Sequence, residues 1–175
     1  SSTVCDPVIV NPIVESHVTI HHGSVGEAPS MYTRLLVTAP DGPNAGVIFL
    51  TWELRLNVAA DNGPSFPIYR SLDGGRTWEH LSDVADTHFR YGNRYQPVLY
   101  ELPEPFAGLP QGTILLVGNA IPADASSTNL VIYASVDGGA TWRFVSLVDA
   151  GGPAVYDWRR DAATTAVWEP DLLLA

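Results

Sequence analysis

The chain has 175 residues, of which 46% are hydrophobic and 16% charged, so it can bury a sizeable core and is not a disordered tail. Its net charge of −10 argues against nucleic-acid binding, which needs clustered lysine and arginine. All nine basic residues are arginine, which excludes a P-loop lysine or a Schiff-base mechanism within this chain. No run approaches the roughly 18 apolar residues that span a membrane, so we expect no membrane association.

The first 31 residues contain two apolar pieces, at residues 8–10 and 17–21, which are followed by a loop rich in glycine, serine and proline. We expect one or two short strands here. Cys5 is the only cysteine, so the chain has no disulfide framework of its own and no zinc-site spacing around a thiol.

Two longer segments then repeat the same order of strand-like runs. The first contains the runs 32–37, 47–52, 67–71 and 78–81, and the second contains 95–100, 113–119, 130–135 and 142–147. No long stretch has the 3.6-residue apolar period of an amphipathic helix. Four short strands joined by tight turns are typical of one blade of a β-propeller.

A repeated motif, Ser-x-Asp-x-Gly-x-Thr-Trp, occupies residues 71–78 and 135–142, 64 residues apart. Its Asp-Gly-Gly sequence predicts a hairpin turn, with the aspartate accepting hydrogen bonds from amides of its own turn. The tryptophan that follows offers a large apolar face for burial. The motif resembles the Asp-box of sialidase-like propellers, and we expect it to have a structural rather than a catalytic role.

The sequence therefore predicts an all-β chain built from four-stranded antiparallel blades. We assign residues 1–31 to an N-terminal strand and loop, 32–94 to blade one, 95–167 to blade two and 168–175 to the first strand of blade three. Propellers generally need four to eight blades, so this much cannot close a ring. We expect the remainder of the propeller to come from sequence beyond this chain or from another chain; an oligomer of several copies is the alternative.

The starts of the first strands are the natural wall of a pocket, because the first strand of each blade lies nearest the propeller axis. They are residues 32–34, 95–97 and 168–170. Glu169 beside Trp168 combines a carboxylate with an apolar wall for a sugar ring, and glycosidases typically use two carboxylates. The alternative for Glu169 is a strand-end carboxylate that pairs with an arginine. Arg34 either binds ligand or pairs with Glu169 across the pocket.

Other polar residues are weaker candidates. His21 and His22 could be metal ligands, but adjacent residues on a strand point to opposite faces. The loop carboxylates Asp61, Asp86, Asp157 and Asp161 could each be a catalytic partner, although turn capping or exposure to solvent is the commoner role. Four arginines precede the first strands and could reach the pocket; they are Arg90, Arg94, Arg159 and Arg160.

Three stretches resemble the glycoside hydrolases of family 93: the run from Arg94 to Pro103, the Gly-Asn-Ala-Ile-Pro sequence that starts at Gly118 with the Ser-Ser-Thr after it, and the final Val167 to Pro170. The resemblance covers about residues 30–175, the first part of such an enzyme. It implies a six-bladed propeller that acts as an exo-α-1,5-L-arabinanase and releases arabinobiose with retention of configuration.

The resemblance also implies the site residues. Glu169 matches one of the family's two catalytic glutamates, and the second is expected beyond this chain. Arg34, Tyr95, Gln96 and Trp168 are expected to shape the sugar subsites of an arabinan or arabino-oligosaccharide substrate. Asp171 departs from the pattern, because the family often has an aromatic residue there. The chemistry requires no metal and no organic cofactor.

Two alternatives to this function stay open. A sialidase would bring several arginines to one carboxylate-binding site, and a non-catalytic propeller would bind a glycan or peptide without a second carboxylate near Glu169. In each case we expect a secreted, extracellular protein, because the chain opens with Ser-Ser-Thr, as a processed mature protein does.

Overall fold

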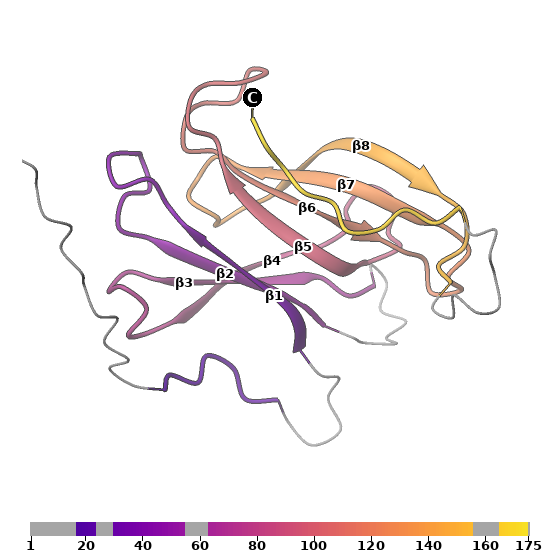
Figure 1. Cartoon of the computed structure of the whole chain (residues 1–175), viewed down its shortest axis with the longest axis horizontal. Helices are drawn as coiled ribbons and strands as arrows, with labels where there is room; N and C mark the ends of the chain where they lie inside the picture. The colour runs from indigo at the N-terminus through magenta and orange to yellow at the C-terminus, as the bar shows by residue number, and fades with distance from the viewer. Residues whose placement is uncertain (1–16, 24–29, 55–62, 156–164, 175) are drawn as a thin grey trace, which may run out of the picture.

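The computed structural model describes residues 17–23, 30–54, 63–155 and 165–174 (Figure 1). Within these ranges the chain forms eight strands and no helix, and thus nothing helical that could cross a membrane. The strands make two four-stranded antiparallel sheets in sequence order. The first sheet contains β1 (Ser30–Val37), β2 (Ile48–Leu54), β3 (Phe66–Ser71) and β4 (Glu79–Val84), and the second contains β5 (Asn93–Glu101), β6 (Ile114–Ala120), β7 (Thr128–Ser135) and β8 (Arg143–Gly151).

The all-β fold class predicted from the sequence is confirmed, and each of the eight predicted runs in the two repeated segments corresponds to an observed strand. Antiparallel neighbours in sequence order, in two successive four-stranded sheets, match the expectation of two propeller blades. The boundaries that we assigned to the blades stay a prediction, because the structure gives strands rather than domain limits.

Two predicted strands are not formed. Residues 17–21 and 168–174 are described, and neither is part of a sheet; the apolar piece at 8–10 lies outside the described residues. The backbone of the C-terminal segment is instead hydrogen-bonded to side chains of the second sheet. The Asn119 amide donates to the carbonyl of Val167 at 2.7 Å, and the amide N–H of Leu174 donates to the Tyr100 hydroxyl at 3.3 Å. Without a second strand alongside, an apolar sequence is not enough to make a strand.

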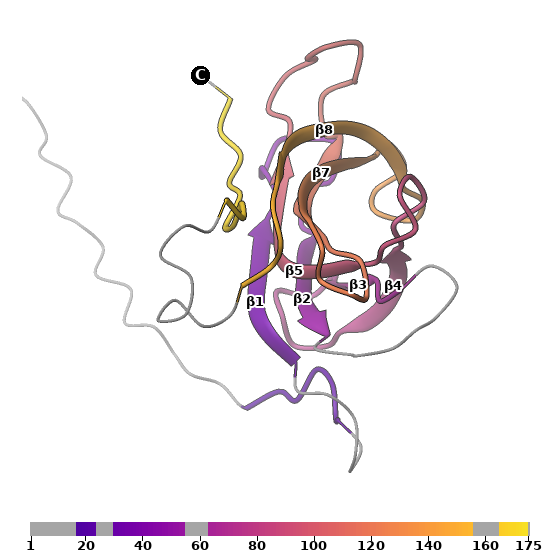
Figure 2. The same ribbon diagram turned by 90° about the vertical axis from the view of Figure 1, so that its right-hand side faces the viewer.

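The core lies between the two sheets, which face one another with β5 packed against β1 and β2 (Figures 1 and 2). Its buried side chains come from both sheets: Phe49, Phe66, Ile68, Val84, Leu99, Ile114, Leu116, Ala120, Val131 and Tyr133. The sheets approach closely at Gly118, where a β-carbon would overlap the ring of Phe66. A side chain at position 118 would therefore push the sheets apart, and only glycine fits there.

The connection between the sheets is fixed by the buried carboxylate of Asp86. It accepts hydrogen bonds from four backbone amides of the loop, at residues 88, 89, 91 and 92, and from the hydroxyl of Tyr133 at 2.9 Å. Burial, together with the Asp86 charge, raises the pKa of Tyr133, so this hydroxyl stays protonated and remains a donor. Asp86, one of the loop carboxylates considered for catalysis, is thus a structural anchor that ties the loop to β7.

The repeated motif forms the turn between the third and fourth strand of each sheet. In the first copy, Asp73 accepts hydrogen bonds from the Ser71 hydroxyl at 2.8 Å, the Thr77 amide at 2.9 Å and the Thr77 hydroxyl at 2.7 Å. In the second copy, Asp137 makes the corresponding three bonds at 2.7, 2.9 and 2.6 Å. In each copy the aspartate is thus hydrogen-bonded to residues of its own turn, which agrees with the structural role that we expected.

Candidate active site

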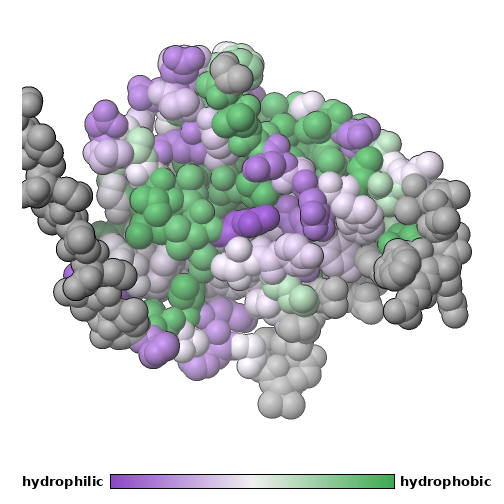
Figure 3. Space-filling model, viewed as in Figure 1, coloured by the Kyte–Doolittle hydropathy of each residue, from purple (hydrophilic) through white to green (hydrophobic). Residues whose placement is uncertain are grey.

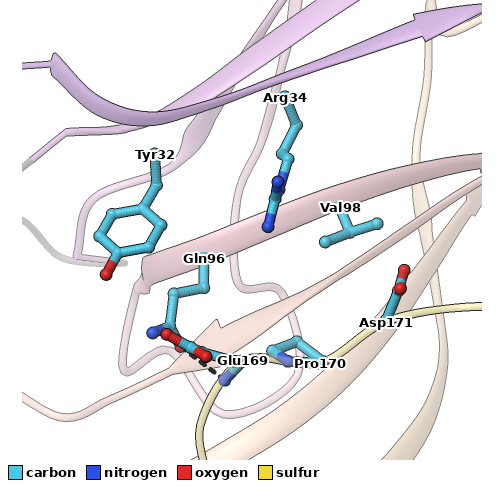
Figure 4. A pocket seen from close by; sticks show the side chains of 7 residues that line it. All are labelled: Tyr32, Arg34, Gln96, Val98, Glu169, Pro170 and Asp171. Carbon is cyan, nitrogen blue, oxygen red and sulfur yellow. Dashed lines mark hydrogen bonds between the residues drawn. The ribbon is translucent and has the colours of Figure 1, made fainter.

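Three segments meet around a pocket of about 170 Å³. Its lining residues come from β1, from β5 and from the C-terminal segment: Tyr32, Arg34, Gln96, Val98, Glu169, Pro170 and Asp171. Figure 4 shows Arg34 reaching from β1 toward Gln96 and Val98 of β5, with Glu169 and Asp171 on the C-terminal segment below them. The starts of all three predicted first strands therefore converge on one place.

The same backbone feature appears once in each of the three segments. Tyr32, Gln96 and Glu169 have φ angles of 49°, 58° and 53°, in the left-handed region that residues other than glycine rarely occupy. In β1 and β5 this residue lies in a β-bulge, where the pairing register shifts between Met31 and Arg34 and between Tyr95 and Val98. The pocket is lined by the left-handed residue and the residue two positions later in every segment. The bulges therefore determine which side chains face the pocket.

Hydrogen bonds hold two of these strained positions. The backbone N–H of Gln96 donates to a carboxylate oxygen of the buried Glu53 at 3.0 Å. The backbone N–H of Glu169 donates to the side-chain oxygen of Gln96 at 2.8 Å (Figure 4). A left-handed residue costs on the order of 1 kcal/mol, and such positions persist where the surroundings fix them, often at functional sites.

The pocket carries one cationic and two anionic side chains, those of Arg34, Glu169 and Asp171. No ion pair joins Arg34 to Glu169, so the pairing considered from the sequence is not formed. The side chains of Arg34 and Glu169 are both exposed to solvent in this chain. Trp168, which we expected as an apolar wall for a sugar ring, does not line this pocket. The arrangement offers both a carboxylate for proton transfer or nucleophilic attack and donors for sugar hydroxyls.

Three of the five predicted site residues lie together in this pocket: Arg34, Gln96 and Glu169. The other two, Tyr95 and Trp168, do not line it. Their rings pack edge to face with centroids 6.2 Å apart. Each immediately precedes the left-handed residue of its segment. The roles of all five residues stay predictions.

The expected pocket wall at residues 32–34, 95–97 and 168–170 included Tyr32 and Pro170, and the structure places both in the lining. It did not include Val98 and Asp171. These two could have been found from the alternation of side chains along a strand, because they lie two positions after Gln96 and Glu169. Which of the two alternating sets of side chains faces the pocket depends on the position of the left-handed residue. Nothing in the sequence marks Tyr32, Gln96 or Glu169 as left-handed.

The remaining candidates are placed elsewhere or lie outside the described residues. His21 packs its ring 5.6 Å from that of Trp52. Arg94 is buried and donates to the carbonyl of Ile121 at 2.6 Å, so it acts within the fold rather than in the pocket. Cys5, Asp61, Asp157, Arg159, Arg160 and Asp161 lie outside the described residues.

The chain is similar to solved structures of two enzymes. The α-L-arabinanase of Penicillium chrysogenum in complex with arabinobiose is 43% identical with a TM-score of 0.73; the match covers 85% of this chain and 41% of that one. The family GH93 α-L-arabinofuranosidase of Fusarium graminearum with arabinobiose is 42% identical with a TM-score of 0.73, covering 83% and 38%. The same arabinofuranosidase with an iminosugar inhibitor is 40% identical, also at a TM-score of 0.73, covering 85% and 40%. The chain thus spans about two fifths of the length of these enzymes. No protein-family model and no curated protein sequence matches it.

Proposed function

We propose that this chain, which belongs to glycoside hydrolase family 93, supplies part of the active site of an enzyme that hydrolyses arabinan. One observation carries the proposal. Glu169 lies in a pocket with Arg34 and Gln96, in a chain 42–43% identical to two enzymes whose structures hold arabinobiose. Identity of this level over most of the chain makes a shared ligand class the simplest expectation. The carboxylate, the arginine and the amide are the groups that a sugar site uses.

In the proposed mechanism, Glu169 is one of two catalytic glutamates of a retaining exo-enzyme that releases arabinobiose from α-1,5-linked arabinan. The second glutamate comes from the part of the propeller outside this chain, about 5–5.5 Å from Glu169, as retention requires. One carboxylate attacks the anomeric carbon while the other carboxyl group protonates the leaving oxygen. The group that gave up its proton then activates the water that releases the sugar. Arg34 and Gln96 bind hydroxyls of the substrate.

We also propose that the rest of the propeller covers the open face of the first sheet and that the enzyme is secreted to reach its polymeric substrate. Apolar surface gathers over β1 and β2 on one face (Figure 3), where Leu35 and Val37 are 56% and 65% exposed. An exposed apolar sheet face of this kind normally packs against another part of the protein. Finding the mature full-length protein in culture supernatant would test its secretion.

The test is Glu169→Gln in the full-length protein, assayed on linear arabinan. Removing a catalytic carboxylate should lower kcat by about 10³-fold or more and leave thermal unfolding unchanged. Asp171→Asn is the matched control, because it neutralises the neighbouring carboxylate of the same pocket and should cost far less. Activity of Glu169→Gln within several-fold of wild type would contradict the assignment. Release of sialic acid from sialyl-lactose would favour a sialidase. Binding of a glycan or peptide without hydrolysis would favour a non-catalytic propeller.

A further inference from the structure

At two successive steps around the pocket, a side chain of one segment fixes the backbone of the next. Glu53 of β2 accepts from the backbone N–H of Gln96 on β5, at 3.0 Å, and Gln96 in turn accepts from the backbone N–H of Glu169, at 2.8 Å. In both steps the donor is the left-handed residue of its segment. The two bonds thus connect the first sheet to Glu169 through a single intervening residue.

Glu53 acts at a distance from any ligand in this pocket. Its side chain is fully buried and does not line the pocket, so its hydrogen bond to the backbone of Gln96 links it to the site indirectly. Burying a carboxylate costs free energy unless hydrogen bonds offset it, and a bond from a backbone N–H to a carboxylate is stronger than a neutral one. Such a bond holds the strained backbone of Gln96 more firmly than an apolar contact would.

The second sheet has a corresponding residue at the equivalent position. Glu53 lies opposite Met31 in the β1–β2 ladder, and Asn119 lies opposite Tyr95 in the β5–β6 ladder, each beside the residue that precedes the bulge. Asn119 is also fully buried, and its amide donates to the carbonyl of Val167 at 2.7 Å, two residues before Glu169. Both sheets therefore use this position to reach the start of the next segment.

We infer that Glu53 and Gln96 are positioning residues that set the placement of the Glu169 carboxylate, with Asn119 as a second support. The inference rests on the proposed function, since it assigns these residues to the reaction that Glu169 performs. Glu169 lies in a segment without a strand ladder, so side-chain hydrogen bonds take the place of sheet pairing in fixing its backbone. Catalytic groups must be held within about 0.5 Å of the productive geometry, and such support is what provides that precision.

The experiment compares Glu53→Leu with Glu53→Gln in the full-length protein on linear arabinan. Leucine has a similar size but no acceptor, whereas glutamine keeps an oxygen for the N–H of Gln96. Gln96→Met, at a half-exposed position, removes the second bond together with the proposed contact to a substrate hydroxyl, so its effect on positioning is judged from the placement of Glu169 as well as from kcat. Thr51→Val is the control, because Thr51 is buried on the same strand and its hydroxyl has no hydrogen-bond partner. Thermal unfolding of each variant is measured alongside kcat and KM.

We expect Glu53→Leu and Gln96→Met to lower kcat by about tenfold or more, with Glu53→Gln within about threefold of wild type and Thr51→Val unchanged. A purely structural role would lower the melting temperature but leave the kcat of the folded enzyme unaltered. Retention of kcat within about twofold by both Glu53→Leu and Gln96→Met, or equal losses in Glu53→Leu and Glu53→Gln, would overturn the inference.

Crystal structures of the variants separate this inference from the proposed function. If the wild-type protein releases no sugar from arabinan, the proposed function fails, and the position of Glu169 then decides the inference alone. Displacement of Glu169 in Glu53→Leu but not in Glu53→Gln would support the positioning role. An unmoved Glu169 in Glu53→Leu and in Gln96→Met would refute it.

Discussion

The first strand of the first sheet is the more apolar of the two first strands, yet it is the less buried. None of the eight residues of β1 is buried, whereas β5 buries Asn93, Arg94, Pro97 and Leu99. The difference lies in the neighbours, because β5 packs against β1 and β2 while Leu35 and Val37 of β1 face outward. The first strand of a sheet is thus buried by packing against the preceding sheet rather than by pairing within its own sheet. Each sheet therefore contributes one side of an interface between sheets.

The largest expected effect comes from breaking the junction that creates this difference. Asp86→Ala removes a buried acceptor of five hydrogen bonds and should lower the free energy of unfolding by about 3 kcal/mol or more. Chemical denaturation of the full-length protein measures the loss. Hydrogen exchange should show the amides of β5 becoming as accessible as those of β1.

Asp83→Ala is the matched control for that change. Asp83 lies three residues earlier and is exposed, and its contact is with the exposed His80 ring at 3.2 Å, an ion pair only when His80 is protonated. Such pairs contribute about 0–1 kcal/mol. If Asp86→Ala cost no more than Asp83→Ala, the loop would not be what joins the sheets.

The tryptophans of the two motif copies allow a finer comparison of the two sheets, with a smaller expected effect on stability. The ring N–H of Trp142 donates to the Ser82 hydroxyl of the first sheet at 3.0 Å and to the carbonyl of Gly139 at 3.1 Å. The ring N–H of Trp78 donates to Gly75 of its own turn at 3.0 Å. Trp142→Phe should therefore cost about 1 kcal/mol more than Trp78→Phe, measured by thermal unfolding. Equal costs would mean that the second turn gains nothing from contact with the first sheet.

Replacing the aspartates of the repeated motif should have the smallest effect on stability, and the effect should be the same in both sheets. Hydrogen bonds, first from the side chains of Thr77 and Thr141, lower the pKa of Asp73 and of Asp137 to about 2, from 3.8. A lowered pKa means that the folded state binds the proton less readily than the unfolded chain. Each aspartate thus contributes stability that is present above pH 3.8 and lost as the pH falls through about 2.

The corresponding variants are Asp73→Asn and Asp137→Asn. Both should lower the melting temperature slightly at pH 7 and weaken its decline between pH 4 and pH 2, by similar amounts in the two sheets. Melting curves across this pH range provide the measurement. A clearly larger effect in one variant would show that the turn is coupled to its surroundings rather than closed by its own bonds.

Much of the fold could be predicted because the chain repeats itself. The motif at 71–78 and 135–142 fixed the spacing of the strands, and strand spacing led to the three strand starts that meet in the pocket. The third segment could not be placed in the same way. Its apolar sequence resembles that of β5, but a strand requires a partner for its backbone, and a sequence pattern contains no information about that partner.

The site was predicted less completely because its geometry depends on backbone angles that ordinary residue types conceal. Glycine or asparagine would have indicated a left-handed position, yet tyrosine, glutamine and glutamate occupy the three that shape the pocket. For this reason Tyr95 and Trp168 were expected to line the sugar subsites, and Val98 and Asp171 were not. Glu53 was missed because a carboxylate within an apolar strand gives no indication of the residue it will bond.

The bulges at Tyr32 and Gln96 have a consequence for how this protein can change over time. Both residues fall in the gaps of their ladders, between Met31 and Arg34 and between Tyr95 and Val98, so neither is paired with the neighbouring strand. Substitutions at such positions can alter what the pocket accepts without disturbing sheet pairing. New ligand preferences can therefore arise by single replacements at Tyr32, whereas Gln96 also holds the backbone of Glu169. An engineer who wishes to retune specificity should begin at Tyr32.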